Sequence, residues 1–176
     1  MRVVAGRLRG RIFGSPRTKR THPMSDRMRG ALFNTLGDIE GLSVLDAFAG
    51  TGAIAIESIS RGARQATAIE RDKSAYQLLV ENIESLECEQ QIKATCANVA
   101  SWSSQNREVE FDIIVCDPPY QKPQHKTLKK LAQHLSSNGT YVLSLPAAEE
   151  LLVIPGLKLI KSQKHAGGSL HYYKHA

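Results

Sequence analysis

The sequence predicts an α/β fold, in which a doubly wound, mostly parallel sheet ends in an antiparallel C-terminal hairpin. Three observations favour this class. From residue 43 onward, apolar and β-branched runs alternate with amphipathic stretches of helical period. A glycine-rich turn follows the first of these runs, and the residues Asp-Pro-Pro-Tyr follow a later one. Both lie where a parallel sheet ends at its carboxyl edge, which is where such sheets bind ligands.

The first 35 residues are strongly basic. They hold nine Lys and Arg residues and one acid, Asp26, whereas the whole chain has a net charge of +6. The remaining residues are therefore slightly acidic. A charge concentrated in one segment is typical of proteins that bind nucleic acid, and a solvated tail is the alternative. The candidate RNA-binding cations are Arg2, Arg7, Arg9, Arg11, Arg17, Lys19, Arg20, Arg27 and Arg29.

Residues 1–20 alternate short apolar pairs with glycines and arginines, which indicates a β-hairpin or an extended arm with its arginines toward solvent. A helix is expected to follow, with Ser25 as N-cap and Asp26 in the first turn. It would end near Leu36 and before Gly37. Its predicted buried face consists of Met28, Leu32 and Leu36, and its predicted projecting cations are Arg27 and Arg29.

The rest of the chain alternates strands and helices. The predicted strands are 43–48, 65–69, 91–97, 111–116, 140–145, 157–164 and 169–174. The predicted helices are 53–61, 73–85 and 127–135, and a polar loop is expected over 101–110. We expect one domain over residues 1–176, with 1–37 as a basic extension and 38–176 as the cofactor-binding core.

Composition excludes several classes of protein. The three cysteines form no CxxC pair, so structural disulfides are not expected. The absence of expected disulfides favours a cytoplasmic location. No apolar stretch approaches the ~20 residues of a membrane span. The His and Cys residues lack metal-ligand spacing. We therefore expect a cytoplasmic protein without a metal or a membrane partner, and a monomer.

The glycine-rich turn predicts a site for an adenosine-type cofactor. Gly50 and Gly52 allow a close approach of the backbone, and the following helix offers free N–H groups. Glu70 ends the next strand, where an acid can accept both hydroxyls of a ribose. The pattern Gly-x-Gly-x-x-Ala also suits a dinucleotide. Asp46 distinguishes a dinucleotide from S-adenosylmethionine as the cofactor. A carboxylate at this position would repel the pyrophosphate of a dinucleotide but complement the ammonium group of S-adenosylmethionine.

The Asp-Pro-Pro-Tyr motif predicts a binding site for a planar group that carries an NH2. It consists of Asp117, Pro118, Pro119 and Tyr120. The two prolines fix two φ angles, so the carbonyl of Pro118 is a rigid acceptor beside the carboxylate of Asp117. Tyr120 adds an aromatic face on which a nucleobase could stack. The alternative is that the motif has a structural role only, as a Pro-Pro turn that ends a strand. Asn98, after the third strand, could bind an adenine amine, and Trp102 is expected to be packing.

These motifs resemble the class I S-adenosylmethionine-dependent methyltransferases, whose Rossmann-like fold agrees with the predicted one. More narrowly, the chain resembles the small-subunit (16S) ribosomal RNA guanine-N2 methyltransferases, the RsmD family. The resemblance rests on the basic opening of the chain, on the motifs above and on the segment His22-Pro-Met-Ser-Asp-Arg-Met-Arg-Gly-Ala-Leu-Phe-Asn34. Within that segment His22, Met24 and Gly30 depart from the family pattern. Asn98 departs from it too, and the segment after Tyr120 is short.

The resemblance implies direct methyl transfer to the N2 amine of a guanine in ribosomal RNA or a partly assembled small subunit. It implies S-adenosylmethionine as cofactor and Asp117, Pro118, Pro119 and Tyr120 as the catalytic residues. The implied cofactor-binding residues are Asp46, Phe48, Gly50, Gly52, Glu70, Arg71, Asn98 and Val99. Three alternatives remain open: a DNA amino-methyltransferase, an NAD-dependent oxidoreductase, which Asp46 disfavours, and a non-catalytic RNA-binding assembly factor.

Overall fold

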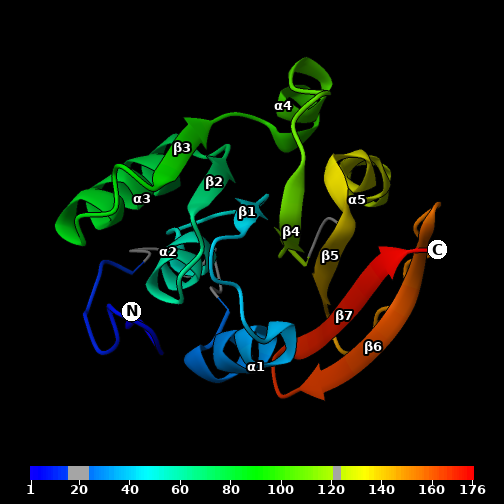
Figure 1. The fold of residues 1–176 in the computed structure, drawn as a ribbon, viewed down its shortest axis with the longest axis horizontal. Helices are drawn as coiled ribbons and strands as arrows, with labels where there is room; N and C mark the ends of the chain where they lie inside the picture. The colour runs from blue at the N-terminus through cyan, green and yellow to red at the C-terminus, as the bar shows by residue number, and fades with distance from the viewer. Residues whose placement is uncertain (16–23, 121–123) are drawn as a thin grey trace.

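A computed structural model describes residues 1–15, 24–120 and 124–176 of the chain. Within them, one sheet of seven strands has the order β3-β2-β1-β4-β5-β7-β6 (Figure 1). The strands are β1 Ser43–Asp46, β2 Gln65–Glu70, β3 Ile92–Cys96, β4 Phe111–Cys116, β5 Leu135–Leu145, β6 Leu157–His165 and β7 Gly168–His175. The first five pair in parallel, and β7 pairs antiparallel with both β5 and β6. The predicted fold class is confirmed.

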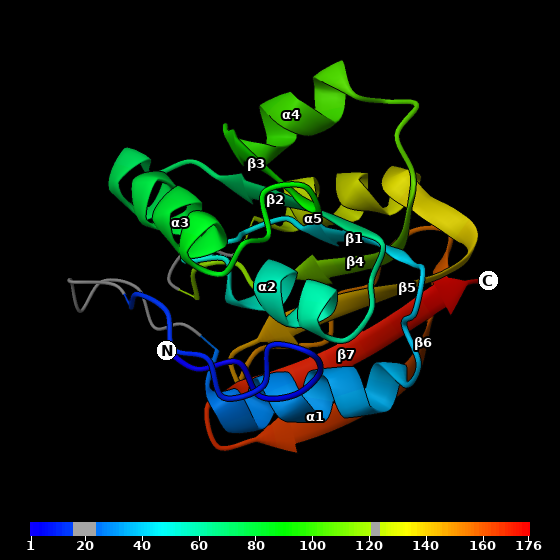
Figure 2. The ribbon, with the colours of Figure 1, turned by 60° about the vertical axis from the view of Figure 1, so that its left-hand side comes forward.

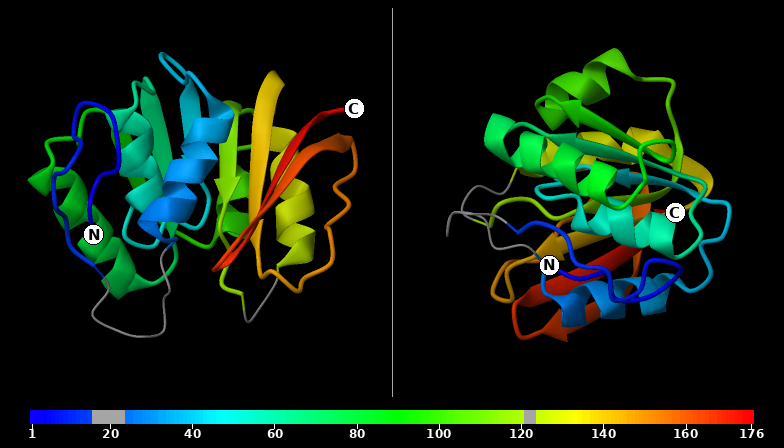
Figure 3. Two further views of the ribbon diagram at one scale, coloured as in Figure 1. Left: turned by 90° about the horizontal axis from the view of Figure 1, so that it is seen from below. Right: turned by 90° about the vertical axis from the view of Figure 1, so that its left-hand side faces the viewer.

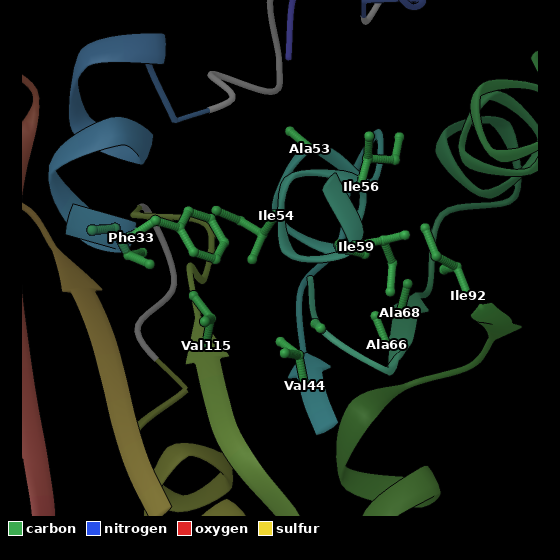
Figure 4. Close-up of a cluster of buried hydrophobic side chains, with 14 of the residues drawn as sticks. Phe33, Val44, Ala53, Ile54, Ile56, Ile59, Ala66, Ala68, Ile92 and Val115 are labelled. Carbon is green, nitrogen blue, oxygen red and sulfur yellow. The ribbon is translucent and has the colours of Figure 1, made fainter. Parts of the chain in front are cut away.

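Helices cover both faces of the sheet (Figure 2). They are α1 Asp26–Leu36, α2 Ala53–Ser60, α3 Lys73–Ser85, α4 Val99–Gln105 and α5 His125–Leu131, followed by the 3₁₀ turn Ala132–His134. One apolar core lies under α1, α2 and α3, and the other lies under α4 and α5. Figure 4 shows the first core, where Ile54 of α2 lies beside Phe33 of α1 and Ile59 of α2 lies beside Ala66 and Ala68 of β2. A doubly wound sheet results.

One predicted loop and one predicted helix end were wrong. Residues 101–110 were expected to be a polar loop, but α4 occupies 99–105. Its N-cap is Asn98, and Val99, Trp102 and Ser103 are its buried residues. The apolar face of α4 is so short, and so interrupted by serines, that the sequence pattern does not indicate a helix there. The helix expected to end at residue 135 gives way to β5, which continues through the Ser-Ser-Asn-Gly stretch that predicts a turn.

The N-terminal segment packs as a closed loop rather than as a regular hairpin. A single antiparallel bridge joins Arg2 to Ile12, and the loop between them buries Val3 and Leu8. The two views of Figure 3 show this segment beside α2. The backbone amides of Val4 and Ala5 donate to Glu57 of α2 at 2.8 and 3.0 Å. The basic segment is therefore fixed to the core by a buried carboxylate.

Helix α1 begins as predicted, since the Ser25 side chain accepts from the amide of Met28. The expectation that Arg29 projects to solvent was wrong, because its side chain is fully buried. Its guanidinium contacts Glu57 at 3.4 Å and Asp26 at 2.9 Å, and it donates to the backbone carbonyl of Arg2. Arg29 joins α1, α2 and the N-terminal segment, so it is not free to bind RNA. A helical pattern shows which face is buried but not that an ion pair lies on it.

Replacing Glu57 with Gln is expected to destabilise the protein by about 3–5 kcal/mol, because the change leaves the Arg29 charge buried and undercompensated. Glu57 is itself 1% exposed and also holds Arg61 at 2.8 Å. Urea unfolding measures the difference. Glu81→Gln is the control, since Glu81 lies exposed on α3 and, among the described residues, its carboxylate accepts a hydrogen bond from Gln77 alone. Equal losses for the two variants would contradict a structural role for this buried contact.

Candidate functional site

Three carboxylates converge at the carboxyl edge of the central strands. Asp46 ends β1, Glu70 ends β2, and Asp117 follows β4 directly. The parallel register places these strand ends side by side, since Asp46 lies opposite Ala68 of β2 and Val115 of β4. Both Glu70 and Asp117 raise the pKa of Asp46 by charge repulsion. This edge is therefore strongly electronegative and suited to a cationic ligand.

Asp46 is 1% exposed, and one of its oxygens accepts from the amide of Ala55 at 3.2 Å. Burial is the main cause that raises its pKa from 3.8 to about 7, and the neighbouring carboxylates add to it. Asp46 has no cationic partner among the described residues. A buried carboxylate without a counter-ion is costly unless a ligand supplies one.

Glu70 stabilises the glycine-rich turn by accepting a hydrogen bond from its backbone. One carboxylate oxygen accepts from the amide of Gly50 at 2.9 Å, and the other accepts from the amide of Asp72 at 2.7 Å. Glu70 is partly exposed, so each oxygen keeps a lone pair available for a further hydrogen bond. The predicted ribose-binding acid thus also sets the shape of the turn.

The two glycines of the turn meet different constraints. Gly52 has φ +85°, and a Cβ there would lie 2.4 Å from Cδ1 of Leu79. Gly50 has φ +54°, and a Cβ there would meet nothing within 4 Å. Gly52 is thus required both for its backbone conformation and for the packing of α3 against the turn, while Gly50 is required for conformation alone.

Gly52→Ala is expected to cost about 1–3 kcal/mol of stability and to weaken cofactor binding, because its left-handed conformation is penalised and either the turn or the buried Leu79 side chain must shift. Gly50→Ala is the matched control and is expected to cost about 1 kcal/mol, since only its left-handed conformation is penalised. Thermal unfolding with and without cofactor measures both effects. Equal effects at the two positions would contradict the role assigned to the Leu79 contact.

The Asp-Pro-Pro-Tyr residues lie across the edge from the glycine turn. Asp117 is partly exposed, and burial raises its pKa from 3.8 to about 6, partly offset by a hydrogen bond from Ser144. Pro118 is buried and Pro119 exposed. Tyr120 is 39% exposed, and its hydroxyl lies 3.0 Å from the hydroxyl of Ser144. The ring is thus tied at its hydroxyl end, with part of its surface open to a ligand.

Ser144 and Gly168 also frame this site, and sequence reasoning missed both. A Cβ on Gly168 would lie 2.5 Å from the hydroxyl oxygen of Tyr120 and 2.6 Å from the carbonyl oxygen of Leu145. Only a glycine permits this close contact between the β6–β7 turn and the tyrosine. The Gly-Gly pair before β7 was the available signal, but by itself it predicts a hairpin turn and not the contact.

The remaining predicted cofactor residues follow the ends of β1, β2 and β3. The Asn98 side-chain carbonyl oxygen accepts from the amides of Ala100 and Ser101 at 2.9 and 3.4 Å, so this side chain caps α4. Val99 is buried, Phe48 partly buried and Arg71 exposed. Trp102 is buried, with its ring 6.2 Å from Phe111 and 5.3 Å from His134, so its prediction as packing is confirmed.

The predicted RNA-binding cations that the structure describes differ in their exposure to solvent. Arg2 and Arg27 are exposed at α1, where Arg2 lies 3.8 Å from Asp26. Arg7, Arg9 and Arg11 are exposed in the N-terminal loop, and Arg29 is buried as described above. Arg17, Lys19 and Arg20, together with His22, lie outside the described residues.

Over residues 1–15, 24–120 and 124–176, no group of three or more His, Cys, Asp or Glu side chains could hold a metal ion. Among the same residues, none of the helices combines the length and apolar character that crossing a membrane requires.

The sheet order and this edge define the class as class I methyltransferase, a class whose enzymes take a methyl group from S-adenosylmethionine. The sequence profile of the family described as conserved hypothetical protein 95 matches residues 1–174. The chain belongs to this family, which comprises the RsmD-like methyltransferases.

Similar proteins support this assignment. Ribosomal RNA small subunit methyltransferase D of Escherichia coli K12 is 34% identical over 140 residues, which cover 79% of this chain and 68% of that protein. YlbH of Bacillus subtilis, provisionally named an rRNA methyltransferase, is 32% identical over 174 residues, covering 96% and 94%. The solved structure of yhhF from E. coli, provisionally titled a methyltransferase, has a TM-score of 0.88 at 27% identity, covering 99% and 97%. A protein of Thermus thermophilus, TTHA0928, reaches 0.84 at 25% identity, covering 99% of each chain.

Proposed function

We propose that the protein transfers a methyl group from S-adenosylmethionine to the exocyclic N2 amine of a guanine in small-subunit ribosomal RNA. The observation that carries the proposal is the convergence of Asp46, Glu70 and Asp117 at one sheet edge, with Tyr120 beside them. In this proposal residues 38–176 form the catalytic core, and residues 1–37 form an RNA-binding extension.

The residues of the edge fit the cofactor. The buried, unpaired carboxylate of Asp46 complements an ammonium group, and the partly exposed carboxylate of Glu70 can accept from ribose hydroxyls. Gly50 and Gly52 allow the close backbone approach that the ligand requires. Phe48, Arg71, Asn98 and Val99 would complete the adenosine side, although the side-chain carbonyl oxygen of Asn98 already caps α4. The bound cofactor supplies an electrophilic methyl group on a sulfonium.

Asp117 and the carbonyl of Pro118 would accept the two N–H bonds of the guanine amine. This is important because the lone pair of that nitrogen is delocalised into the ring, so the amine is a poor nucleophile. Holding the nitrogen in line, at ~3–3.5 Å from the methyl carbon, supplies much of the rate enhancement. The raised pKa of Asp117, about 6, also suits this carboxylate to receive the amine proton as the N–C bond forms.

Tyr120 would stack on the base, an interaction worth roughly 1–3 kcal/mol. Its ring is fixed for that purpose by Ser144 and by the close contact with Gly168. Since the amine of a stacked and paired guanine is inaccessible, the base must be flipped out or already unpaired.

Ribosomal RNA is favoured as substrate by the names of the relatives and by the exposed arginines of the N-terminal segment. A DNA amino-methyltransferase is the second candidate, because the Asp-Pro-Pro-Tyr residues alone also suit adenine or cytosine amines. Labelled S-adenosylmethionine, incubated separately with small-subunit rRNA, assembled small subunits and DNA, distinguishes the two. The proposal expects label in RNA or in subunits; label in DNA alone would overturn it.

A further inference from the structure

A second basic surface lies at the opposite edge of the sheet from the proposed methyl-transfer site. We call it the amino-edge basic surface and define it by Arg7, Arg9, Arg11 and Arg64. Arg7, Arg9 and Arg11 come from the N-terminal loop, and Arg64 directly precedes β2. All four residues are exposed. The proposed function already assigns the N-terminal arginines to RNA binding, but it assigns no role to Arg64 or to the amino edge of the sheet.

Contacts with the core place Arg7 and Arg11, which flank Arg9 in the loop, at the amino edge. The amide of Arg7 donates to the carbonyl of Ser60, the last residue of α2, at 2.7 Å. The guanidinium of Arg11 donates to the carbonyl of Ser85, the last residue of α3, at 3.1 Å. A cleft of about 640 Å³ opens here, lined by Arg7, Arg61 and Arg64 together with Glu40 and Gln91.

The charges of this surface are available to a ligand. Among the described residues, none of the four arginines forms an ion pair with a carboxylate. The guanidinium of Arg7 is held in place by the side-chain oxygen of Gln91, a neutral partner. Arg61 differs, because Glu57 neutralises it. Three acids offset part of the positive charge: Glu40 lines the cleft, Glu89 lies with Arg7 and Arg11 around Cys88, and Asp112 lies within reach of the charge of Arg64.

The distance from this surface to the catalytic edge is set by α2. That helix begins beside the glycine turn and ends at Ser60, and its eight residues span about 12 Å. A single flipped guanine bound at Tyr120 cannot reach the amino edge. A ligand that contacts both edges must therefore extend over at least about 12 Å, and it must carry negative charge where it meets the arginines.

We propose that the amino-edge basic surface binds phosphate groups of the RNA substrate at a distance from the methylated base. The RNA would run from Asp117 along the face that carries α1 and α2 to Arg9 and Arg64. This proposal rests on the proposed function for its ligand. It implies that a structured RNA binds more tightly, and with a steeper salt dependence, than a short strand that fills only the catalytic edge.

The test compares the double variant Arg9→Ala/Arg64→Ala with the wild type. Neither side chain makes a hydrogen bond to the described residues, so the fold should be unaffected. Binding to protein-free small-subunit rRNA is measured as a function of salt concentration. Losing two phosphate contacts should flatten the slope of log K against log salt by about 1.4–1.8.

The control is Arg107→Ala/Lys174→Ala, which removes the same charge from exposed positions. Arg107 lies in the connection between α4 and β4, on the other face of the sheet. Equal slopes for wild type and the Arg9/Arg64 variant, or an equal loss in the control, would overturn this inference. Absence of methyl transfer by the wild type would instead overturn the proposed function, so the two failures are distinguishable.

Discussion

Replacing Asp117 with Asn is expected to lower kcat for methyl transfer by roughly 10²–10⁴-fold, with little change in cofactor affinity. Asn keeps the size of the side chain but turns one acceptor oxygen into an NH2 donor. That donor would face the hydrogens of the guanine amine, and no group with a pKa of about 6 would remain to accept the proton. Single-turnover transfer of labelled methyl to rRNA measures the step directly, and calorimetry measures cofactor binding.

Asp112→Asn provides the control for Asp117→Asn. Asp112 belongs to the same strand, β4, but it lies at the opposite edge, where it accepts from the amide and hydroxyl of Ser43 at 2.9 and 2.7 Å. Its replacement should cost stability while leaving the activity of the folded protein near that of the wild type. A comparable loss of kcat in both variants, or a loss of cofactor binding in Asp117→Asn, would contradict the role proposed for Asp117.

Affinity for S-adenosylmethionine is expected to rise with pH up to about 7, because Asp46 must be ionised to bind the ammonium group. Below that pKa the ionised fraction falls tenfold per pH unit, and affinity should fall by about the same factor. Binding near pH 6 should accordingly release a proton. Asp46→Asn should flatten this dependence and weaken binding at pH 8 by roughly tenfold or more, as expected for losing a hydrogen bond between charged groups.

The same carboxyl predicts an opposite trend in stability without cofactor. Its pKa is about 7 in the folded protein and 3.8 as the usual value, so between these values the folded state holds more protons than the unfolded state. Stability should therefore fall as pH rises from about 4 to 7, by up to about 4 kcal/mol. Urea titrations over this range measure it, with Asp46→Asn as the comparison that lacks this contribution and keeps that of Asp117. A wild-type stability that rises across the interval would contradict an unpaired buried Asp46.

The sheet and its carboxyl edge were predictable from the sequence because both depend on local patterns. The strand Phe111–Cys116 and the helix Lys73–Ser85 agree with their predicted bounds, since apolar period and caps are encoded in neighbouring residues. Asp46 and Glu70 could be placed at one edge because each ends a parallel strand. A parallel topology thus converts strand ends that are distant in the sequence into one site.

The features that the sequence did not predict depend on contacts between segments that are distant along the chain. Arg29 was expected in solvent, but Glu57 lies 28 positions away and pairs with it inside the core. The contact between Gly168 and Tyr120 likewise joins residues that local pattern cannot relate. Arg64 was not associated with Arg7, because only the folded N-terminal loop brings these two residues to the same cleft.

The central claim is that the methyl group enters ribosomal RNA at a guanine N2 held by Asp117. The most direct measurement is nucleoside analysis of small-subunit rRNA after incubation with labelled S-adenosylmethionine and either wild type or Asp117→Asn. Label is expected in N2-methylguanosine with the wild type and to be nearly absent with the variant. Label in a methylated adenosine or cytidine, or undiminished N2-methylguanosine from the variant, would contradict the claim.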